Sequence, residues 1–552
     1  MKSDVQIAQE HTLEPITHIA DRAGIPSDAI IPFGATKAKV DITKLDWDRP
    51  NGKLVLVTGV SPTPAGEGKS TTLIGLTDAL SLLGKKAVVA LREPSQGPVM
   101  GIKGGAAGGG YSQIVPMEDI NLHFTGDFHA ITAANNTLAA MIDNHIQQGN
   151  ELRIDPRQIT WQRCLDVNDR ALRNVVIGLR GKANGIPRED GFTITAASEI
   201  MAILCLATDL ADLKRRLGAI TIGYSFDGAA INADQIGASG ALTALLKDAL
   251  NPNLVQTLGG TPAFVHGGPF ANIAHGCNSV LATGAALKYG DIVLTEAGFG
   301  SDLGGEKFFD IKARFGDLDV AGAVVTATIR SIKYNAGVKK DKLTEENVEV
   351  LELGVANLAR HVENIRKFGV NPVIALNLFA TDTDAERAWM KQWAEDFGVQ
   401  LAEAEVWAKG GEGALELAQV VLDSLVEGKS TPLYDPAEGV RASIETIARE
   451  VYRAGEVNFS WNAEKDLQQI LENGWDQYPV CISKTQYSFS DNPAELGAPE
   501  GHSLHVRKLI PRTGAGFIVA LTGDVMTMPG LPKRPSAENI DVDEDGKISG
   551  LF

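Results

Sequence analysis

Short runs of consecutive apolar residues alternate along this chain with longer stretches in which apolar residues recur at helical spacing. A continuous apolar run is typical of a strand that is buried on both faces, as strands of parallel sheets are. The clearest runs predict strands at residues 53–57, 87–91, 174–179, 263–265, 291–295, 323–328, 372–377, 479–482 and 517–521. The clearest periodic stretches predict helices at residues 71–83, 196–216 and 344–367.

This alternation of strands and helices predicts an α/β fold with mainly parallel sheets. A chain of 552 residues is long enough for roughly two to four domains, each with its own core. The sequence contains no internal repeat and no long low-complexity linker, so composition alone does not mark the boundaries between domains.

Composition and charge narrow the class of protein. The formal net charge is −18, and a surface this acidic repels nucleic-acid phosphate, although a local basic pocket for a small anion stays possible. The cysteines are scattered, without close pairs, which is typical of a reducing compartment; they are Cys164, Cys205, Cys277 and Cys481. The polar N-terminus and the absence of long apolar runs predict no membrane span and a cytoplasmic location.

The segment LVLVTGVSPTPAGEGKSTTLIGL, residues 54–76, is the strongest local signal. A buried strand leads into a loop rich in Gly and Pro, and GKST then opens a helix, so backbone N–H groups and the helix N-terminus form an anion site. Lys69 is expected to reach the β- and γ-phosphates of ATP, and Ser70 to place its hydroxyl on Mg²⁺. Thr63 stands where the general motif has its first Gly, and the alternative is a glycine-rich turn that caps a helix. The residues predicted to bind ATP are Thr63, Pro64, Ala65, Gly66, Glu67, Gly68, Lys69 and Ser70.

Charged residues follow two of the other predicted strands. The strand at 87–91 ends in Arg92 and Glu93, and ligands of parallel sheets bind beyond the carboxyl ends of strands. Arg92 is therefore expected beside the phosphate loop, where a guanidinium can hold a carboxylate or an acyl phosphate with two hydrogen bonds. The alternative for Arg92 is a surface ion pair. Glu296 follows the strand at 291–295 and could organise Mg²⁺, but an ordinary polar strand end explains it equally well.

Two further motifs follow in the next part of the chain. GIKGGAAGGGY, residues 101–111, lacks the spacing of a dinucleotide-binding motif and predicts a mobile or closely packed loop, or a plain flexible connection. HFTGDFHAITAANN, residues 123–136, brings His123, Asp127 and His129 close together. A zinc site is conceivable there, but no further ligand pair lies at a useful spacing, so acid–base chemistry or substrate positioning by Asp127 is the better interpretation.

The end of the chain imitates a calcium-binding loop. DVDEDGKISGLF, residues 541–552, places acidic residues at the first, third and fifth positions, but Phe552 stands where calcium needs a bidentate Glu. We therefore predict a β-turn or an exposed tail.

In combination, these motifs closely resemble the family of formate–tetrahydrofolate ligases, also called 10-formyltetrahydrofolate synthetases. The resemblance covers essentially the whole chain in order, and one departure is Ala336-Gly337, where the family pattern leads us to expect two glycines. The motifs that carry it are TPAGEGKST, LREPS, GIKGGAAGGGY, HFTGDFHA, FVHGGPFANIAHGCNS, TEAGFGSDLGGEKF, VTATIRSIKYNAG, EVWAKGGEG and MPGLPKRP.

The resemblance implies a ligase of one-carbon metabolism that uses ATP to join formate to tetrahydrofolate, through a formyl phosphate intermediate. It also implies Mg²⁺, a monovalent cation (K⁺ or NH₄⁺) and a homotetramer. The implied fold is a P-loop nucleotide-binding domain at 1–106 and 290–359, elaborated by an inserted α/β domain at 107–289 and a C-terminal α/β domain at 360–552 that contributes to the folate site.

Particular residues take roles from the same resemblance. Lys69 and Ser70 would serve ATP and Mg²⁺, Arg92 would hold formyl phosphate, Glu93 would be among the substrate-binding residues, and Asp127 would belong to the same catalytic site. Phe379 and Trp407 resemble the aromatic pair that encloses the pterin ring, with Phe299 nearby. Core packing is the commoner fate of aromatic residues and is the alternative for this pair. Rival functions are another carboxylate-activating P-loop ligase and a nucleotide-driven switch ATPase.

Overall fold

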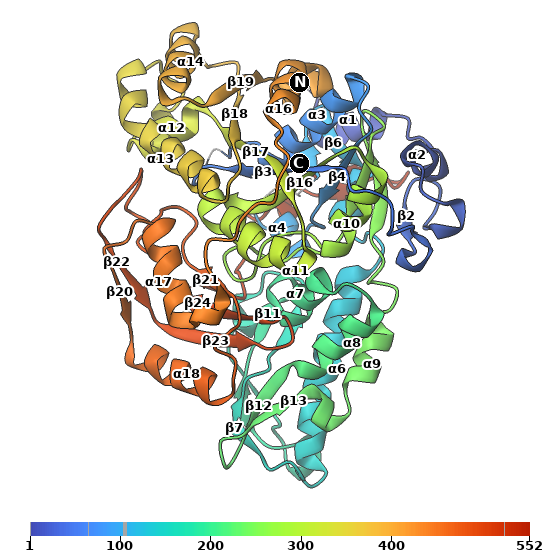
Figure 1. The fold of residues 1–552 in the computed structure, drawn as a ribbon. Helices are drawn as coiled ribbons and strands as arrows, with labels where there is room; N and C mark the ends of the chain where they lie inside the picture. The colour runs from blue at the N-terminus through green and yellow to red at the C-terminus, as the bar shows by residue number, and fades with distance from the viewer. Residues whose placement is uncertain (1, 65, 103–106, 524, 552) are drawn as a thin grey trace.

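A large, mainly parallel sheet forms the centre of the computed structural model, which describes residues 2–64, 66–102, 107–523 and 525–551 (Figure 1). Along its main path the strand order is β1-β2-β14-β15-β4-β16-β3-β17-β18-β19, and β15, β4, β16, β3, β17, β18 and β19 pair in parallel. These seven strands are Pro262–Val265, Ala87–Leu91, Ile292–Gly300, Lys53–Gly59, Val320–Ala327, Pro372–Asn377 and Gln400–Ala404. The predicted mixed α/β fold with a mainly parallel sheet is confirmed.

Helices cover both faces of this sheet because successive side chains of a strand point to opposite sides. Leu54 and Leu56 of β3 pack in the same core as α10 (Val280–Tyr289) and α13 (Val348–Lys367), whereas Val55 and Val57 pack in the core of α3 (Lys69–Leu82) and α16 (Leu415–Ser424). All four β3 side chains are fully buried. The continuous apolar run in the sequence therefore reflects a strand with helices on both sides.

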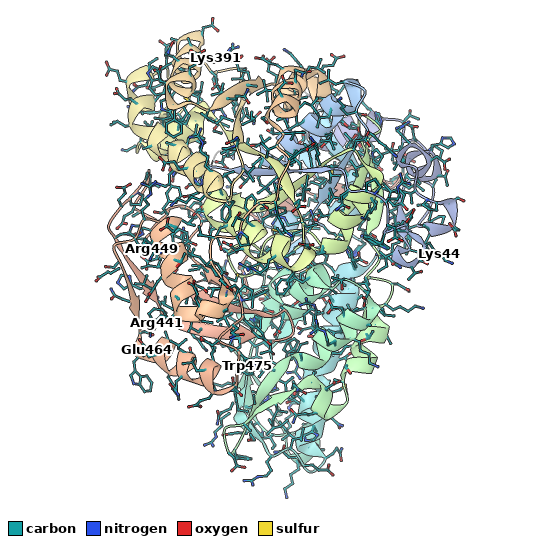
Figure 2. The ribbon with its side chains drawn as sticks, viewed as in Figure 1. Lys44, Lys391, Arg441, Arg449, Glu464 and Trp475 are labelled. Atoms are coloured by element: carbon teal, nitrogen blue, oxygen red, sulfur yellow. The ribbon has the colours of Figure 1, made fainter. Side chains whose placement is uncertain are left out.

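Two further groups of elements pack beside the sheet, as the cyan-to-green and orange-to-red parts in the lower half of Figure 1 show. The first packs around a core to which β24 (Phe517–Leu521) of the second group also contributes, and it contains α6 (Asp127–Gln147), α7 (Glu199–Leu206), α8 (Leu210–Ala219), α9 (Ser239–Leu246), β7 (Ile154–Ile159), β12 (Thr221–Ser225) and β13 (Ala230–Asn232). The second contains α17 (Val440–Glu450), α18 (Trp461–Glu472), β20 (Glu456–Phe459), β21 (Val480–Ser483), β22 (Ser503–Val506), β23 (Lys508–Arg512) and β24 (Phe517–Leu521). Figure 2 labels Arg441 on α17 and Glu464 on α18, which form an exposed ion pair at 2.6 Å.

The remaining elements are short, apart from α14. The helices are α1 (Asp4–Glu10), α2 (Ile16–Ala23), α4 (Gln96–Met100), α5 (Met117–Asn121), α11 (Arg314–Gly316), α12 (Ile329–Asn335), α14 (Asp384–Phe397) and α15 (Val406–Lys409). The strands are β1 (Ile30–Pro32), β2 (Ala38–Val40), β5 (Gly108–Gly109), β6 (Ser112–Val115), β8 (Arg163–Leu165), β9 (Val175–Ile177), β10 (Arg188–Asp190), β11 (Phe192–Ile194), β14 (Asn253–Thr257), β25 (Asp541–Val542) and β26 (Ile548–Ser549). Across the described ranges, no helix has the length and apolar character to span a bilayer.

The structure departs from two predicted elements. The expected helix at 196–216 is broken into α7 and α8, because the Asp209 side chain accepts a hydrogen bond from the backbone N–H of Asp212 and starts a new helix. The strand predicted at 174–179 exists only as β9, which pairs antiparallel with β10 outside the main sheet. The turn predicted near the C-terminus is confirmed as the β25–β26 hairpin, although Phe552 lies outside the described residues.

A run of charged side chains is buried beyond the end of β16, in the segment 301–313. Asp302, Glu306 and Asp310 are fully buried, and Asp302 pairs with Lys484 at 3.1 Å. Burial and the neighbouring Asp310 carboxylate raise the pKa of Glu306 well above its usual value. Burial also raises the pKa of Asp310 to about 7, although its carboxylate accepts a hydrogen bond from Leu433 N. Glu306 and Asp310 therefore hold protons in the folded chain at pH values where the unfolded chain releases them.

We expect Asp310→Asn to flatten the pH dependence of stability. Because the folded-state pKa of Asp310 is raised from 3.8 to about 7, its stabilising effect is present in acid and is lost as pH rises across that interval. The substitution should remove a slope on the order of 1 kcal/mol per pH unit from the dependence of the free energy of unfolding on pH. The measurement is the apparent Tm between those two pH values, with the exposed Asp317→Asn as control. Parallel curves for Asp310→Asn and the original chain would contradict the assignment.

Candidate functional site

The carboxyl ends of three neighbouring parallel strands converge on one point. β4, β16 and β3 lie side by side in the sheet, and Arg92, Glu296 and the loop after Gly59 are at or near their ends. The loop leads into α3, which begins at Lys69. Strand order alone therefore brings together residues that are more than 200 positions apart in the sequence, since Lys69 and Glu296 are separated by 227.

Glycine and a neighbouring strand shape the phosphate loop. Gly66 and Gly68 have φ angles of 75° and 69°, which other residues rarely adopt. Asn377, the last residue of β18, donates a hydrogen bond from Nδ2 to the carbonyl of Glu67 at 3.2 Å. A Cβ on Gly68 would lie 2.3 Å from that same nitrogen. The loop therefore keeps its shape only with glycine at 68 and the amide of Asn377 against it.

Glu296 is the centre of the polar contacts at this point. Lys69 Nζ donates a hydrogen bond to Glu296 Oε2, and Ser70 Oγ lies 3.3 Å from the same oxygen. Arg92 Nε donates to Glu296 Oε1 at 3.3 Å. The Glu296 side chain is fully buried, whereas those of Lys69 and Arg92 are 14% and 19% exposed. One carboxylate therefore joins both predicted cationic residues.

The electrostatics of this group follow from burial and from the neighbouring charges. Burial by itself raises the pKa of Glu296, but the Lys69 and Arg92 charges outweigh burial and lower it to about 2. Burial lowers the pKa of Lys69, and the positive charge of Arg92 lowers it further. The Glu296 carboxylate raises the same pKa, but less than these two effects lower it. The carboxylate is thus ionised at neutral pH, and an incoming anion would compete with it for two cations at once.

The backbone of β16 is adapted to Arg92 and to the phosphate loop. A Cβ on Gly298 would lie 2.9 Å from Arg92 Nη1, so glycine leaves room for the guanidinium. Phe299 has a φ of 60°, an uncommon value for a residue with a side chain, and it is half-buried. Gly300 pairs with Gly59 at the end of β3. The predicted residue Phe299 is therefore part of the same strand end as Glu296.

Glu93 and Asp127 form a second polar group beside Arg92. Asp127 pairs with Lys39 Nζ at 2.7 Å and accepts a hydrogen bond from Asn253 Nδ2 at 2.8 Å. Burial and the nearby Asp127 carboxylate raise the pKa of Glu93 well above its usual value. Both carboxyl groups line a cavity of about 90 Å³. These surroundings favour the protonated form of Glu93.

The two histidines of the same motif also line this cavity. The rings of His123 and His129 have centroids 5.2 Å apart. The described parts of the chain contain no group of three His, Cys, Asp or Glu side chains placed to hold a metal ion. The structure therefore offers no support for the zinc alternative among those residues.

The predicted aromatic residues are half-buried on different elements. Trp407 lies on α15, and its carbonyl accepts a hydrogen bond from Tyr111 N at 2.9 Å. A Cβ on Gly110 would lie 2.8 Å from the Trp407 ring, so the glycine-rich segment packs directly on it. Phe379 follows β18, and the Arg330 guanidinium lies 4.1 Å from its ring centroid. Within the described ranges no ring contact joins Phe379 to Trp407.

The structure places most of the predicted site residues and adds others. Seven of the eight predicted ATP-binding residues lie in the loop or at the start of α3, and Ala65 lies outside the described residues. Sequence reasoning missed Lys39, Asn253 and Asn377. Asn377 was detectable, because it is the last residue of a predicted strand in the same sheet. Lys39 and Asn253 carry no local signal, since each meets Asp127 only through the tertiary fold.

We expect Glu296→Gln to destabilise the chain and to strengthen its affinity for anions. Removing one partner of a buried ion pair leaves uncompensated charge, here that of Lys69 and Arg92, at a cost of about 3–5 kcal/mol. The apparent Tm should fall, and inorganic pyrophosphate should raise it more in this variant than in the original chain. Glu464→Gln, which removes the exposed ion pair of Figure 2, is the control and should have little effect. An unchanged Tm with no response to pyrophosphate would refute the central role of Glu296.

Comparison with known proteins identifies the family of the chain. The family model described as formate–tetrahydrofolate ligase matches residues 2–552. A formate–tetrahydrofolate ligase of Corynebacterium diphtheriae is 70% identical over 552 residues, covering the full length of both chains. One of Corynebacterium jeikeium is 65% identical over 562 aligned residues, covering all of this chain and 98% of the other. The chain therefore belongs to the formate–tetrahydrofolate ligase family.

Proposed function

We propose that this chain uses ATP to join formate to N10 of tetrahydrofolate, giving 10-formyltetrahydrofolate, ADP and phosphate through formyl phosphate. The observation that carries the proposal is the contact of one buried carboxylate, Glu296, with both Lys69 and Arg92. On this proposal Lys69, a cation suited to the γ-phosphate, would act beside Arg92, a guanidinium suited to an acyl phosphate. Membership of the family supports the choice of formate and tetrahydrofolate as substrates.

The nucleotide site is the loop before α3, in a P-loop NTPase-like arrangement. Backbone N–H groups at the start of α3 and the Lys69 ammonium would hold the phosphates. Ser70 Oγ lies 3.3 Å from a Glu296 carboxylate oxygen, and such hard oxygen donors match Mg²⁺. Mg²⁺ bound there would neutralise charge on the terminal phosphates. A monovalent cation, K⁺ or NH₄⁺, completes the proposed requirements, and we assign it no ligands.

The first step transfers the γ-phosphoryl group to formate. A formate oxygen forms a bond to the γ-phosphorus while the bond to the bridging oxygen breaks and ADP leaves. Lys69, released from Glu296 by the competing phosphate, stabilises the negative charge that spreads over the transferred group. Arg92 holds the phosphate and the carbonyl oxygen of formyl phosphate with its planar guanidinium.

The second step transfers the formyl group to the folate. The N10 amine attacks the formyl carbon, the carbon–oxygen bond to phosphate breaks, and phosphate leaves with the electron pair. Lys39 and Asn253 hold the Asp127 carboxylate in a fixed position. We therefore assign Asp127 and the neighbouring Glu93 to positioning the substrates, and the departing phosphate takes the N10 proton.

The proposed pterin site lies between Trp407 and Phe379, with Phe299 at the nearby end of β16. Trp407 is half-buried and packs against the glycine-rich segment on one side, while Phe379 already has a planar guanidinium over its ring. A pterin ring would replace Arg330 on Phe379 or use the opposite face. Stacking of this kind contributes about 0.5–1.5 kcal/mol beyond burial.

We further propose a homotetramer in the cytoplasm, with nucleotide-binding residues 1–106 and 290–359, an inserted unit at 107–289 and a C-terminal unit at 360–552. The inserted unit would contribute β5, β6, β14 and β15 to the main sheet. The four cysteines are all buried thiols without disulfide bonds, which fits a reducing compartment.

The test of this function is to measure ADP and 10-formyltetrahydrofolate together, with each substrate omitted in turn. We expect the two products in equal amounts and only when ATP, formate and tetrahydrofolate are all present. Lys69→Ala should lower the rate on the order of 10²–10³-fold, since it removes one charge-stabilising contact of the transition state. ADP release that ignores both formate and folate would instead identify an ATPase.

We expect Arg92→Lys to separate ligation from nucleotide binding. Lysine keeps the charge that faces Glu296 but loses the fork that contacts phosphate and carbonyl together. Ligation should fall on the order of 10²-fold, whereas the dissociation constant of ATP should change little. Both values are measured on the same folded variant. An equal loss in both would move Arg92 to the ATP site, and no loss in either would make it a structural ion-pair partner of Glu296.

A further inference from the structure

Phe379 lies on the connection between β18 and α14, and the backbone of this connection is fixed at several points. At its start, Asn377 contacts the phosphate loop through the carbonyl of Glu67. Phe379 itself lies in a turn, since its N–H donates to Asp382 Oδ2 at 2.8 Å and its carbonyl accepts a hydrogen bond from Asp382 N at 2.9 Å. The backbone of Phe379 is therefore held in place two residues after the contact with the phosphate loop.

The helix α12 contacts the same part of the chain through two cationic side chains. Lys333 pairs with Glu386 at the start of α14 at 2.5 Å, and both side chains are buried. Arg330, three residues before Lys333, donates a hydrogen bond from Nη2 to Thr381 Oγ1 at 3.0 Å. Residues three positions apart lie on one face of a helix, so this face of α12 is fastened to the connection twice.

The Arg330 guanidinium lies over one face of the Phe379 ring. Its central carbon is 4.1 Å from the ring centroid, well within the range of a cation–π contact. A separation this short requires an approach over a face, because the ring atoms themselves block an approach from the edge. Arg330 Nε is buried and has no hydrogen-bond partner in the part of the chain that the structure describes. The Phe379 ring and Thr381 therefore hold the guanidinium where it is.

A second phenylalanine of this chain carries two such contacts at once. Phe397 has the Arg366 guanidinium 5.4 Å from its ring centroid. The Trp393 indole is stacked on the same ring, with centroids 5.1 Å apart and an interplanar angle of 15°. One phenylalanine ring can therefore hold an arginine and a flat heteroaromatic ring together. Among the described side chains, none is stacked on Phe379 as Trp393 is stacked on Phe397.

We propose that Arg330 is a positioning residue for the folate, which holds the Phe379 ring from one face while the pterin stacks on the opposite face. The inference rests on the proposed pterin site and deepens it, because it decides which face of Phe379 the substrate uses. A pterin that displaced Arg330 would break the hydrogen bond to Thr381 and the cation–π contact, whereas the opposite face keeps both. Arg330 then acts on the folate only through Phe379.

The test is a double-mutant cycle on the KM of tetrahydrofolate, with Arg330→Met, Phe379→Leu and the variant that carries both. Arg330→Met should raise this KM about two- to fivefold, the loss expected for one partly exposed cation–π contact. The KM values of ATP and formate, and kcat, should change little. The double variant should resemble Phe379→Leu, because Arg330 then has no aromatic ring to hold.

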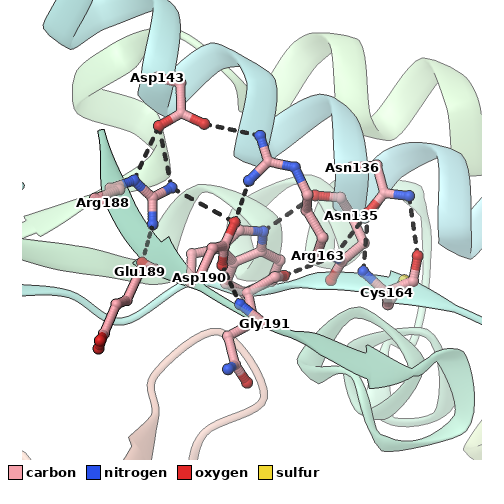
Figure 3. Close-up of polar contacts among 11 residues, drawn as sticks. Asn135, Asn136, Asp143, Arg163, Cys164, Arg188, Glu189, Asp190 and Gly191 are labelled. Atoms are coloured by element: carbon pink, nitrogen blue, oxygen red, sulfur yellow. Dashed lines mark hydrogen bonds and ion pairs between the residues drawn. The ribbon is translucent and has the colours of Figure 1, made fainter. Parts of the chain in front are cut away.

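Two control variants show what does not pass through Phe379. Arg366→Met removes the corresponding cation–π contact at Phe397. Arg188→Met removes the ion pair of Arg188 with Asp143 at 3.0 Å, which Figure 3 shows. We expect both controls to keep the KM of tetrahydrofolate, and Arg188→Met to lower the Tm, since it leaves buried charge without its partner.

The possible outcomes separate this inference from the proposed function. An equal rise in the KM of ATP and of tetrahydrofolate in Arg330→Met would make Arg330 a structural residue of the connection and overturn the inference. Additive losses in the double variant would place Arg330 on the folate itself and would also overturn it. An unchanged KM of tetrahydrofolate in an active Arg330→Met would overturn the inference alone. An original chain that makes no 10-formyltetrahydrofolate would overturn the proposed function and the inference together.

Discussion

The site depends on one buried carboxylate held between two cations. Glu296 has no access to solvent, and an isolated ionised carboxylate in such a place would be costly. Lys69 and Arg92 remove that cost, and each of them is in turn partly buried and needs a negative partner. The three residues therefore stabilise one another as a set. In the proposed mechanism, an anionic substrate would replace Glu296 as the partner of the two cations.

The backbone provides the geometry for this set. Neighbouring parallel strands place the ends of β3, β4 and β16 at one edge of the sheet. Glycine at 298 makes room for the Arg92 guanidinium, and glycine at 68 makes room for Asn377. A side chain at either position would push one of these groups away by steric contact. At these two positions of the motifs, glycine is needed because it allows a neighbouring side chain to approach the backbone closely.

The sequence was most informative where a signal is local. The apolar run at 53–57 followed by GKST predicted both β3 and the start of α3, and the acidic strand end predicted Glu296 as a candidate. The pairing of Asp127 with Lys39 could not be predicted, because 88 positions separate them and only the fold brings them together. The break between α7 and α8 was missed because a capping side chain, Asp209, outweighed a continuous apolar pattern.

In the proposed reaction, formate is activated by phosphorylation at the Lys69–Arg92 site before the folate reacts. The most direct measurement supplies formate labelled with oxygen-18, together with ATP and tetrahydrofolate, and determines the label in the phosphate that is released. If formyl phosphate forms, the formate oxygen that attacked phosphorus stays bound to it, and each phosphate carries one labelled oxygen. Formation of 10-formyltetrahydrofolate with unlabelled phosphate would contradict the account.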